Sequence, residues 1–202
     1  MRNNYQYVDP DYAYTDPKTG ILRNKENIDN AELLTVFESI KSSERLEELI
    51  KNPIKIKNTQ SLLAIHKHLF QDVYRWAGQK RTVEISKEGS QFFPLSHFDK
   101  AFSHIDKLIE EYRNIESSKK EKTARKLAEI LDNVNYLHPF REGNGRTQRE
   151  FVRTLALEKG CILNLNPPDN IDIFERYMGG TINGDMDKLT RLIGELLVGV
   201  GE

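Results

Sequence analysis

The stretch "HPFREGNGRTQR", residues 138–149, gathers a histidine, a carboxylate, two glycines and three arginines in twelve positions. It follows a segment in which Leu127, Leu131 and Val134 repeat at helical spacing, and it runs into a second helical pattern at residues 146–160. We therefore predict a loop that opens a helix. The first turn of a helix has unpaired N–H groups and the positive end of the macrodipole, which favours anions.

The glycines and arginines of this loop indicate a phosphate site. Gly143 and Gly145 allow successive backbone N–H groups to face one concavity, although a plain turn would also need glycine. Arg146 and Arg149 are three positions apart and share a helix face. Cations are unfavourable at a helix N-terminus unless an anion lies between them, and the arginine fork suits phosphate.

Glu142 is the only carboxylate in the loop, and it would repel a phosphate unless a cation lay between them. Mg²⁺ commonly binds one or two carboxylates together with substrate phosphates, so Glu142 is a candidate magnesium ligand. In the alternative interpretation, the motif arginines form ion pairs with Glu142 or Glu150.

His138, at the start of the loop, is a candidate general base, because an unperturbed histidine titrates near neutrality. The alternative is a structural cap of the preceding helix. Phe140 is expected to anchor the loop in the core, and Arg141 and Gln148 are expected to be solvated. A base, a metal ligand and an anion nest favour phosphoryl or nucleotidyl transfer, with donor and acceptor left open. No P-loop or kinase pattern is present.

The rest of the chain predicts an all-α fold with one small β-hairpin, in a single domain over residues 1–202 with a short N-terminal arm and C-terminal helices. Asp29 is the expected N-cap of a first helix, with Glu32 completing a capping box. Further helices are expected at residues 44–50, at 62–76, from Ser96 or His97, and from Thr123. The hairpin is expected within residues 81–94.

Composition places the chain among soluble globular proteins, with 38% hydrophobic and 30% charged residues. A net charge of −1 argues against a uniformly basic nucleic-acid binder, and the basic residues of 67–81 are interspersed with core positions. No apolar run approaches the ~20 residues that span a membrane, and no signal peptide is apparent. Cys161 is the only cysteine and is expected to be buried. We expect a cytoplasmic protein.

The motif resembles the signature of Fic-domain proteins, H-x-F-x-[DE]-G-N-G-R-x-x-R, and every fixed position is filled. The segments "DPKTGILRNKENI", residues 16–28, and "FQDVYRWAGQKRTVEISKEGSQFFP", residues 70–94, also resemble stand-alone members of that family. The resemblance implies a small helical core with a flap hairpin. It also implies a bacterial protein adenylyltransferase, which transfers AMP from Mg²⁺-bound ATP to a Ser, Thr or Tyr hydroxyl of a target protein.

Carried over by the resemblance, His138 deprotonates the target hydroxyl and Glu142 holds Mg²⁺. The other matched positions surround the phosphates: Gly143, Asn144 and Gly145 as the anion hole, and Arg146 and Arg149 at the β- and γ-phosphates. The flap would hold the target segment as an added strand. Its residues are Val83, Glu84, Ile85, Ser86, Lys87, Glu88, Gly89, Phe92 and Phe93.

Many family members inhibit themselves through a helix with the pattern [ST]-x-x-x-E-[GN], whose glutamate pairs with the second motif arginine. Here Ser43 and Glu47 fit, but Glu48 stands where the pattern needs Gly or Asn. The chain therefore resembles the toxins whose glutamate comes from a separate small antitoxin. Toxins of that type modify type II topoisomerase subunits and cause growth arrest or cell filamentation.

Two alternatives to adenylylation stay open at this point. The same fold could transfer UMP, phosphate or phosphocholine, or the chain could be a non-catalytic nucleotide-binding regulator. Tyr177 and Met178, in the apolar C-terminal region, are candidates for the adenine pocket and are not part of the predicted site.

Overall fold

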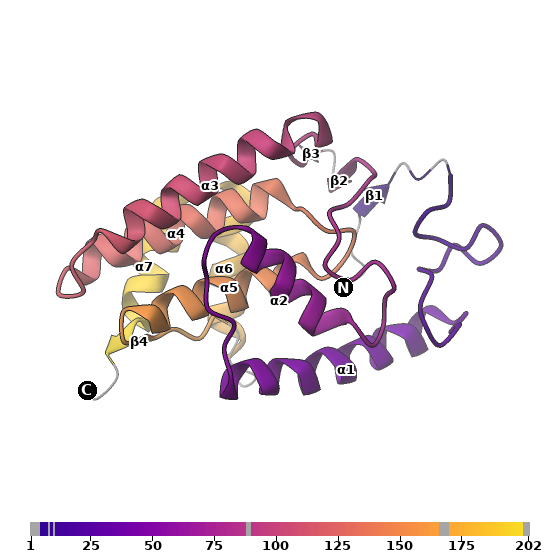
Figure 1. Ribbon diagram of the computed structural model, residues 1–202, viewed down its shortest axis with the longest axis horizontal. Helices are drawn as coiled ribbons and strands as arrows, with labels where there is room; N and C mark the ends of the chain where they lie inside the picture. The colour runs from indigo at the N-terminus through magenta and orange to yellow at the C-terminus, as the bar shows by residue number, and fades with distance from the viewer. Residues whose placement is uncertain (1–4, 8, 10, 88–89, 166–169, 200–202) are drawn as a thin grey trace.

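The computed structural model describes residues 5–7, 9, 11–87, 90–165 and 170–199, which form seven α-helices and a few short strands (Figure 1). α3 and α4 run side by side along one long side of the molecule and α1 runs along the opposite side, with α2 and α5 between them. The helices are α1 (Ala31–Lys51), α2 (Gln60–Phe70), α3 (Phe98–Arg113), α4 (Lys120–Leu137), α5 (Asn144–Glu158), α6 (Ile171–Asn183) and α7 (Met186–Leu196), and a 3₁₀ turn, η1 (Leu95–His97), precedes α3.

The core is centred on α4, which packs against α3, α5 and α7. The predicted stripe of Leu127, Leu131 and Val134 is buried, and Phe151 and Leu155 of α5 are buried beside it. Because these two helices flank the motif, burial of their apolar faces fixes the start and end of the loop. The mostly helical fold is confirmed.

The first helix differs from the prediction in its cap and in its length. Asn30, not Asp29, is the N-cap, and its side chain accepts a hydrogen bond from the Leu33 N–H at 2.9 Å. The two helices expected before Pro53 are one helix of 21 residues, α1. Serines at its centre do not break it, since packing of one face outweighs their modest helix propensity.

The second helix ends sooner than predicted, at Phe70 rather than near Trp76. The N–H groups of Val73 and Tyr74 both donate to the Phe70 carbonyl at 3.0 Å, which closes the helix in a turn. Gly78 then has φ +82°, and a Cβ there would lie 2.7 Å from the Lys67 Cβ. Glycine is needed because the chain folds back closely over α2.

The predicted hairpin is present as β2 (Ile85–Lys87) and β3 (Ser90–Gln91), which are antiparallel. Glu88 and Gly89, at its predicted tip, lie outside the described residues. A third strand, β1 (Tyr5–Tyr7), pairs with the other edge of β2, so the sheet order is β1-β2-β3. The sequence patterns did not predict this strand. One edge of the flap is therefore already covered by the N-terminal arm.

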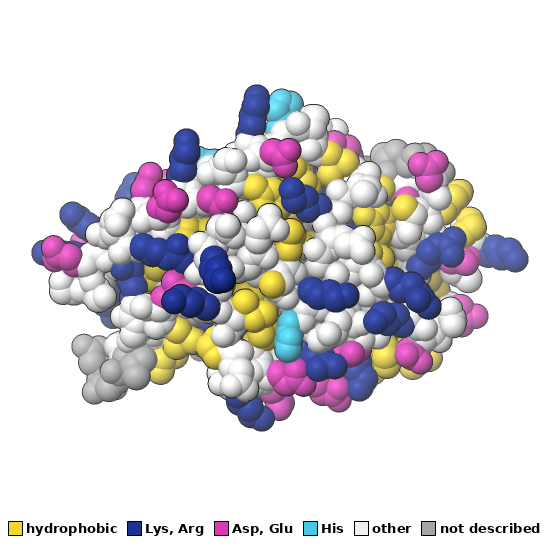
Figure 2. Space-filling view, in the orientation of Figure 1, with side chains coloured by type: hydrophobic (Ala, Val, Ile, Leu, Met, Phe, Trp, Pro, Cys, Tyr) yellow, Lys and Arg dark blue, Asp and Glu magenta, His cyan; other side chains and the backbone are white. Residues whose placement is uncertain are grey.

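A second small ribbon, also unpredicted, pairs β4 (Cys161–Ile162) with β5 (Val198–Gly199). Cys161 is half-buried rather than buried, since it lies in this surface ribbon. Within the described part of the chain, none of the helices has the combined length and apolar character needed to cross a membrane. On the face drawn in Figure 2, basic and acidic side chains are interspersed.

Candidate active site

The motif loop connects α4 to α5 and is fixed at both ends by left-handed residues. His138, the C-cap of α4, has φ +45°, and Gly143, the N-cap of α5, has φ +79°. A Cβ at Gly143 would lie 2.3 Å from the Phe70 ring, so this position needs glycine for space as well as for φ. The Asn144 amide binds both the N–H and the carbonyl of Phe140, at 2.9 and 2.8 Å.

Phe140 anchors the loop, as predicted: it is fully buried and stacks on His66 of α2 with ring centroids 3.8 Å apart. Nδ1 of His66 accepts from the Gly78 N–H at 2.8 Å, so the proton is on Nε2, which donates to the Glu142 carbonyl at 3.0 Å. Burial lowers the pKa of His66 to about 3. A neutral histidine from α2 thus holds the loop.

His138 is a helix cap and also has the geometry of a base. Its Nδ1 lies 3.2 Å from the Asn135 carbonyl, and because a carbonyl can only accept, Nδ1 carries the proton. Nε2 then has the lone pair that a general base requires. The imidazole stacks on Phe92, just beyond β3 of the flap, with centroids 3.8 Å apart. The histidine thus lies next to the flap.

Arg81, which belongs to no sequence motif, joins the flap to the loop. Its buried guanidinium donates to the carbonyls of His138 (2.9 Å), Val83 (2.7 Å) and Phe93 (2.6 Å). Its backbone N–H donates to the Pro139 carbonyl at 2.7 Å. One side chain therefore fixes both ends of the flap relative to His138.

Glu142 is partly buried, and its Oε1 accepts from the Gly143 N–H at 2.9 Å. Burial, together with the nearby charge of Glu38, raises the pKa of its carboxyl group. No group of three or more His, Cys, Asp or Glu side chains suited to a metal occurs in the described residues. One carboxylate beside an anion nest fits Mg²⁺ only when nucleotide phosphates complete the coordination, which is common for this ion.

The anion nest is formed by the backbone at the start of α5. The Thr147 N–H donates to the Gly143 carbonyl at 3.1 Å, so the N–H groups of residues 144–146 precede the first helical bond and point away from the helix. The Asn144 side chain is engaged within the loop, so this residue offers the nest its backbone N–H rather than its amide.

The two predicted phosphate arginines have different surroundings. Arg146 forms an ion pair with Glu38 of α1 and donates to the Ser42 hydroxyl at 2.8 Å. The Arg149 guanidinium lies over the Tyr177 ring, 5.4 Å from its centroid, and has no carboxylate within ion-pair distance among the described residues. The alternative pairing with Glu142 or Glu150 is wrong, because Glu150 pairs with Arg153 at 2.6 Å.

Three minor expectations about the site are also wrong. Arg141 and Gln148 are buried rather than solvated, and Gln148 donates to the Tyr177 hydroxyl. Tyr177 itself is only 1% exposed and its ring lies against the Arg149 guanidinium, so it does not form an open adenine wall. A helical periodicity of apolar residues could not reveal these inward-facing polar positions.

The chain resembles known proteins over most of its length. Residues 56–156, half of the chain, match the model of the Fic/DOC family. The chain is 31% identical to the probable protein adenylyltransferase y4lH of Sinorhizobium fredii, over 94% of this chain and 98% of that protein. It is 35% identical to protein adenylyltransferase VbhT of Bartonella schoenbuchensis, over 77% of this chain but only 33% of the length of VbhT.

Among solved structures, BepC of Bartonella tribocorum with bound AMPPNP superposes with a TM-score of 0.80 at 18% identity, covering 93% of this chain and 97% of that one. At this identity the likeness concerns the fold. Because the family model matches half of the chain and y4lH is 31% identical over 98% of its length, the chain belongs to the Fic/DOC family.

Proposed function

We propose that this chain is a protein adenylyltransferase, which transfers AMP from Mg²⁺-bound ATP to a Ser, Thr or Tyr hydroxyl of a target protein. The observation that carries the proposal is His138, held by the Asn135 carbonyl in the tautomer of a base, at the opposite end of a pinned loop from the anion nest of α5. The relatives named as adenylyltransferases, and the AMPPNP bound by BepC, support this choice of reaction.

In this reaction the target hydroxyl oxygen attacks the α-phosphorus of ATP. The new O–P bond forms as the bond from the α-phosphorus to the bridging oxygen breaks, and pyrophosphate leaves. His138 Nε2 takes the hydroxyl proton. The N–H groups of the nest at residues 144–146 and the motif arginines, Arg146 and Arg149, stabilise charge on the phosphates. Mg²⁺, held by Glu142 and the phosphates, would neutralise charge on the leaving pyrophosphate.

The flap would align the target by strand addition. Because β1 covers one edge of β2, the edge of β3 is the one that remains for a target strand among the described strands. Phe92 follows β3 directly and stacks on His138, which would bring a strand added at this edge close to the base. Backbone pairing does not depend on the side chains of the target strand. The choice of target protein would therefore depend on surfaces outside the flap.

The proposed test replaces His138 with Ala and incubates the protein with Mg²⁺, bacterial lysate and ATP labelled at the α-phosphate. Label transfer to protein should fall by about 10²–10⁴, the usual contribution of general-base catalysis. His104→Ala, which removes an exposed histidine of α3, is the matched control and should transfer normally. Undiminished transfer by His138→Ala would contradict the mechanism.

The same assay separates adenylylation from the alternatives. Transfer of the α label without the γ label identifies AMP as the transferred group, whereas phosphate transfer would carry the γ label and UMP transfer would need UTP. A regulator without catalytic activity would bind ATP and label nothing. Mass spectrometry of the labelled band would identify the target and the modified residue.

We further propose that the chain acts in the bacterial cytoplasm as the toxin of a toxin–antitoxin pair. The support is that no carboxylate of the described residues pairs with Arg149, the arginine to which an inhibitory glutamate would bind. A small antitoxin would supply that glutamate, and a type II topoisomerase subunit is the proposed target, with filamentation as the outcome.

A further inference from the structure

Glu38 is a buried carboxylate in a helix face that otherwise packs against the core. It lies on the inner side of α1 between Leu34 and Ser42, and it is 9% exposed. It accepts hydrogen bonds from the Tyr74 hydroxyl and from Arg146, the first motif arginine. A buried charge requires this degree of pairing, since an unpaired carboxylate in the interior is strongly unfavourable.

Both terminal nitrogens of Arg146 in turn bind side chains of α1. One terminal nitrogen binds Glu38, the other donates to the Ser42 hydroxyl at 2.8 Å, and the guanidinium lies over the Phe70 ring, 4.7 Å from its centroid. Its positive charge is neutralised within the protein. Arg149 has the opposite situation, because it rests on an aromatic ring and faces no acidic partner among the described residues.

We propose that Glu38 is a positioning residue that makes the two motif arginines unequal. Glu38 holds Arg146 as a tie between α1 and the start of α5 and cancels its charge, so that Arg149 supplies the uncompensated positive charge for the triphosphate of ATP. This inference rests on the proposed nucleotide-binding function. It changes the assignment of Arg146 from a phosphate contact to the partner that neutralises Glu38.

The charge argument predicts a specific pattern for Mg²⁺-bound ATP, measured as the dissociation constant in a direct binding titration. Arg146→Gln leaves the Glu38 charge unpaired near the nest, so ATP binding should weaken. Adding Glu38→Gln removes that charge and should restore the dissociation constant to within about fivefold of the wild-type value. Arg149→Gln should weaken binding by about tenfold or more, as expected when a charge-assisted contact is lost, with no rescue by Glu38→Gln.

A direct phosphate role for Arg146 gives the opposite result. In that case the Glu38→Gln/Arg146→Gln protein would stay weaker than wild type by more than about fivefold, since the phosphate contact itself is missing. That outcome would overturn the inference. If this pair of substitutions does not fold, Glu38→Met/Arg146→Met provides the same comparison, because apolar side chains often replace a buried ion pair without loss of stability.

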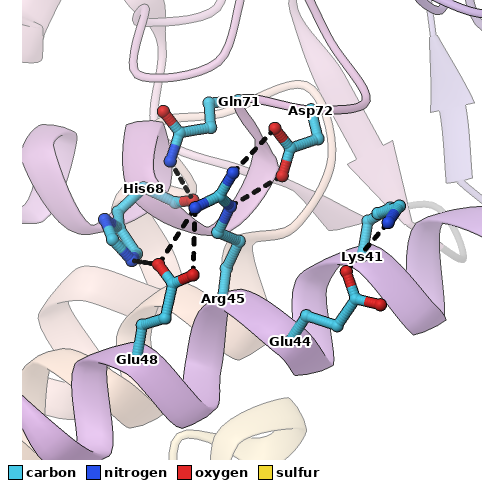
Figure 3. Close-up of polar contacts among 7 residues, drawn as sticks. All are labelled: Lys41, Glu44, Arg45, Glu48, His68, Gln71 and Asp72. Atoms are coloured by element: carbon cyan, nitrogen blue, oxygen red, sulfur yellow. Dashed lines mark hydrogen bonds and ion pairs between the residues drawn. The ribbon is translucent and has the colours of Figure 1, made fainter.

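A second ion pair between α1 and the rest of the protein provides the control. Figure 3 shows Arg45 of α1 bound to Asp72, just beyond α2, and also to Glu48 of its own helix. The two hydrogen bonds from Arg45 to Asp72 are 2.6 and 3.0 Å long. Both side chains of the Arg45–Asp72 pair are partly exposed, at 29% and 34%. Arg45→Gln/Asp72→Asn therefore loosens the same helix away from the motif and should leave the dissociation constant unchanged.

The titration needs no target protein, so it separates this inference from the proposed function. A wild-type protein that does not bind Mg²⁺-bound ATP would contradict the proposed function itself. A wild-type protein that binds ATP, with no rescue of Arg146→Gln by Glu38→Gln, would contradict only the role given to Glu38.

Discussion

His66 shows how a side chain in an apolar helix controls a loop 76 residues further along the chain. It connects Gly78 to the Glu142 carbonyl and stacks on Phe140, and the hydrogen bond that Nδ1 accepts from the Gly78 N–H requires the neutral ring. A protonated ring could not accept from the Gly78 N–H. Burial and the hydrogen bond from Gly78 therefore both favour the neutral imidazole of His66, and burial lowers its pKa to about 3.

This state predicts a pH dependence of stability. The unfolded chain takes up a proton on this histidine below its ordinary pKa of 6.5, whereas the folded chain resists protonation until about pH 3. The stability that the folded chain gains from keeping His66 neutral is thus fully present above pH 6.5. It is lost as the pH falls from 6.5 towards 3, at about 1.4 kcal/mol per pH unit.

Urea unfolding between pH 7 and pH 5 measures this dependence in a range where most carboxylates stay ionised. The wild-type free energy of unfolding should fall more steeply with acid than that of His66→Gln, by about 2 kcal/mol over the range. Equal pH slopes in the two proteins would contradict a neutral, buried His66.

The residues of the motif could be predicted because they are consecutive, so that spacing alone places a base, a carboxylate and a nest on one loop. The residues that support the motif could not be predicted from the sequence. Glu38, His66 and Arg81 are distant in the sequence, and each lies in a segment where its neighbours predict a plain helix or turn. Only the folded chain brings Glu38 to the Arg146 side chain, and His66 and Arg81 to backbone carbonyls of the motif.

At the scale of the elements, the flap is positioned by Arg81 rather than by its own short ladder. β2 and β3 pair over few residues, and isolated hairpins are marginal in water. The three carbonyls that Arg81 binds belong to the motif loop and to both ends of the flap. The planar guanidinium reaches all three, which a single ammonium group cannot do.

Arg81→Lys should therefore loosen the flap while keeping the charge. We expect faster amide hydrogen exchange at residues 83–93, and transfer of the α label reduced by about tenfold or more, because a displaced flap misaligns the target. Arg75→Lys, at an exposed position in the preceding turn, is the matched control. Unchanged exchange in Arg81→Lys would show that the flap is held by other contacts.

The predicted elements with strong periodicity, α4 and α5, are found where the sequence placed them, because each buries one continuous apolar stripe. The elements that the sequence missed are defined by pairing between distant segments. β1 has three residues and pairs with β2 about eighty positions away, and β4 pairs with β5 across the C-terminal helices. Strands this short leave no alternation long enough to detect.

At the scale of the whole molecule, the two sides of α1 determine whether the chain restrains itself. The inner side contacts the motif through Glu38. Ser43 and Glu47, which match part of the inhibitory pattern, are exposed. Glu47 is nine residues beyond Glu38, and at 100° per residue this spacing puts it on the opposite side of the helix. Its carboxylate therefore points away from the motif.

Glu47→Ala should consequently leave transfer of the α label within about twofold of the wild-type level, the change expected of an exposed charge far from the site. A glutamate that restrained Arg149 would give the opposite result, because its removal would release an arginine for the triphosphate and raise transfer by about tenfold or more. Such a rise would contradict the orientation of α1 and make the chain its own inhibitor. With transfer unchanged, Glu47 does not restrain Arg149, and a chain purified alone should transfer AMP without further activation.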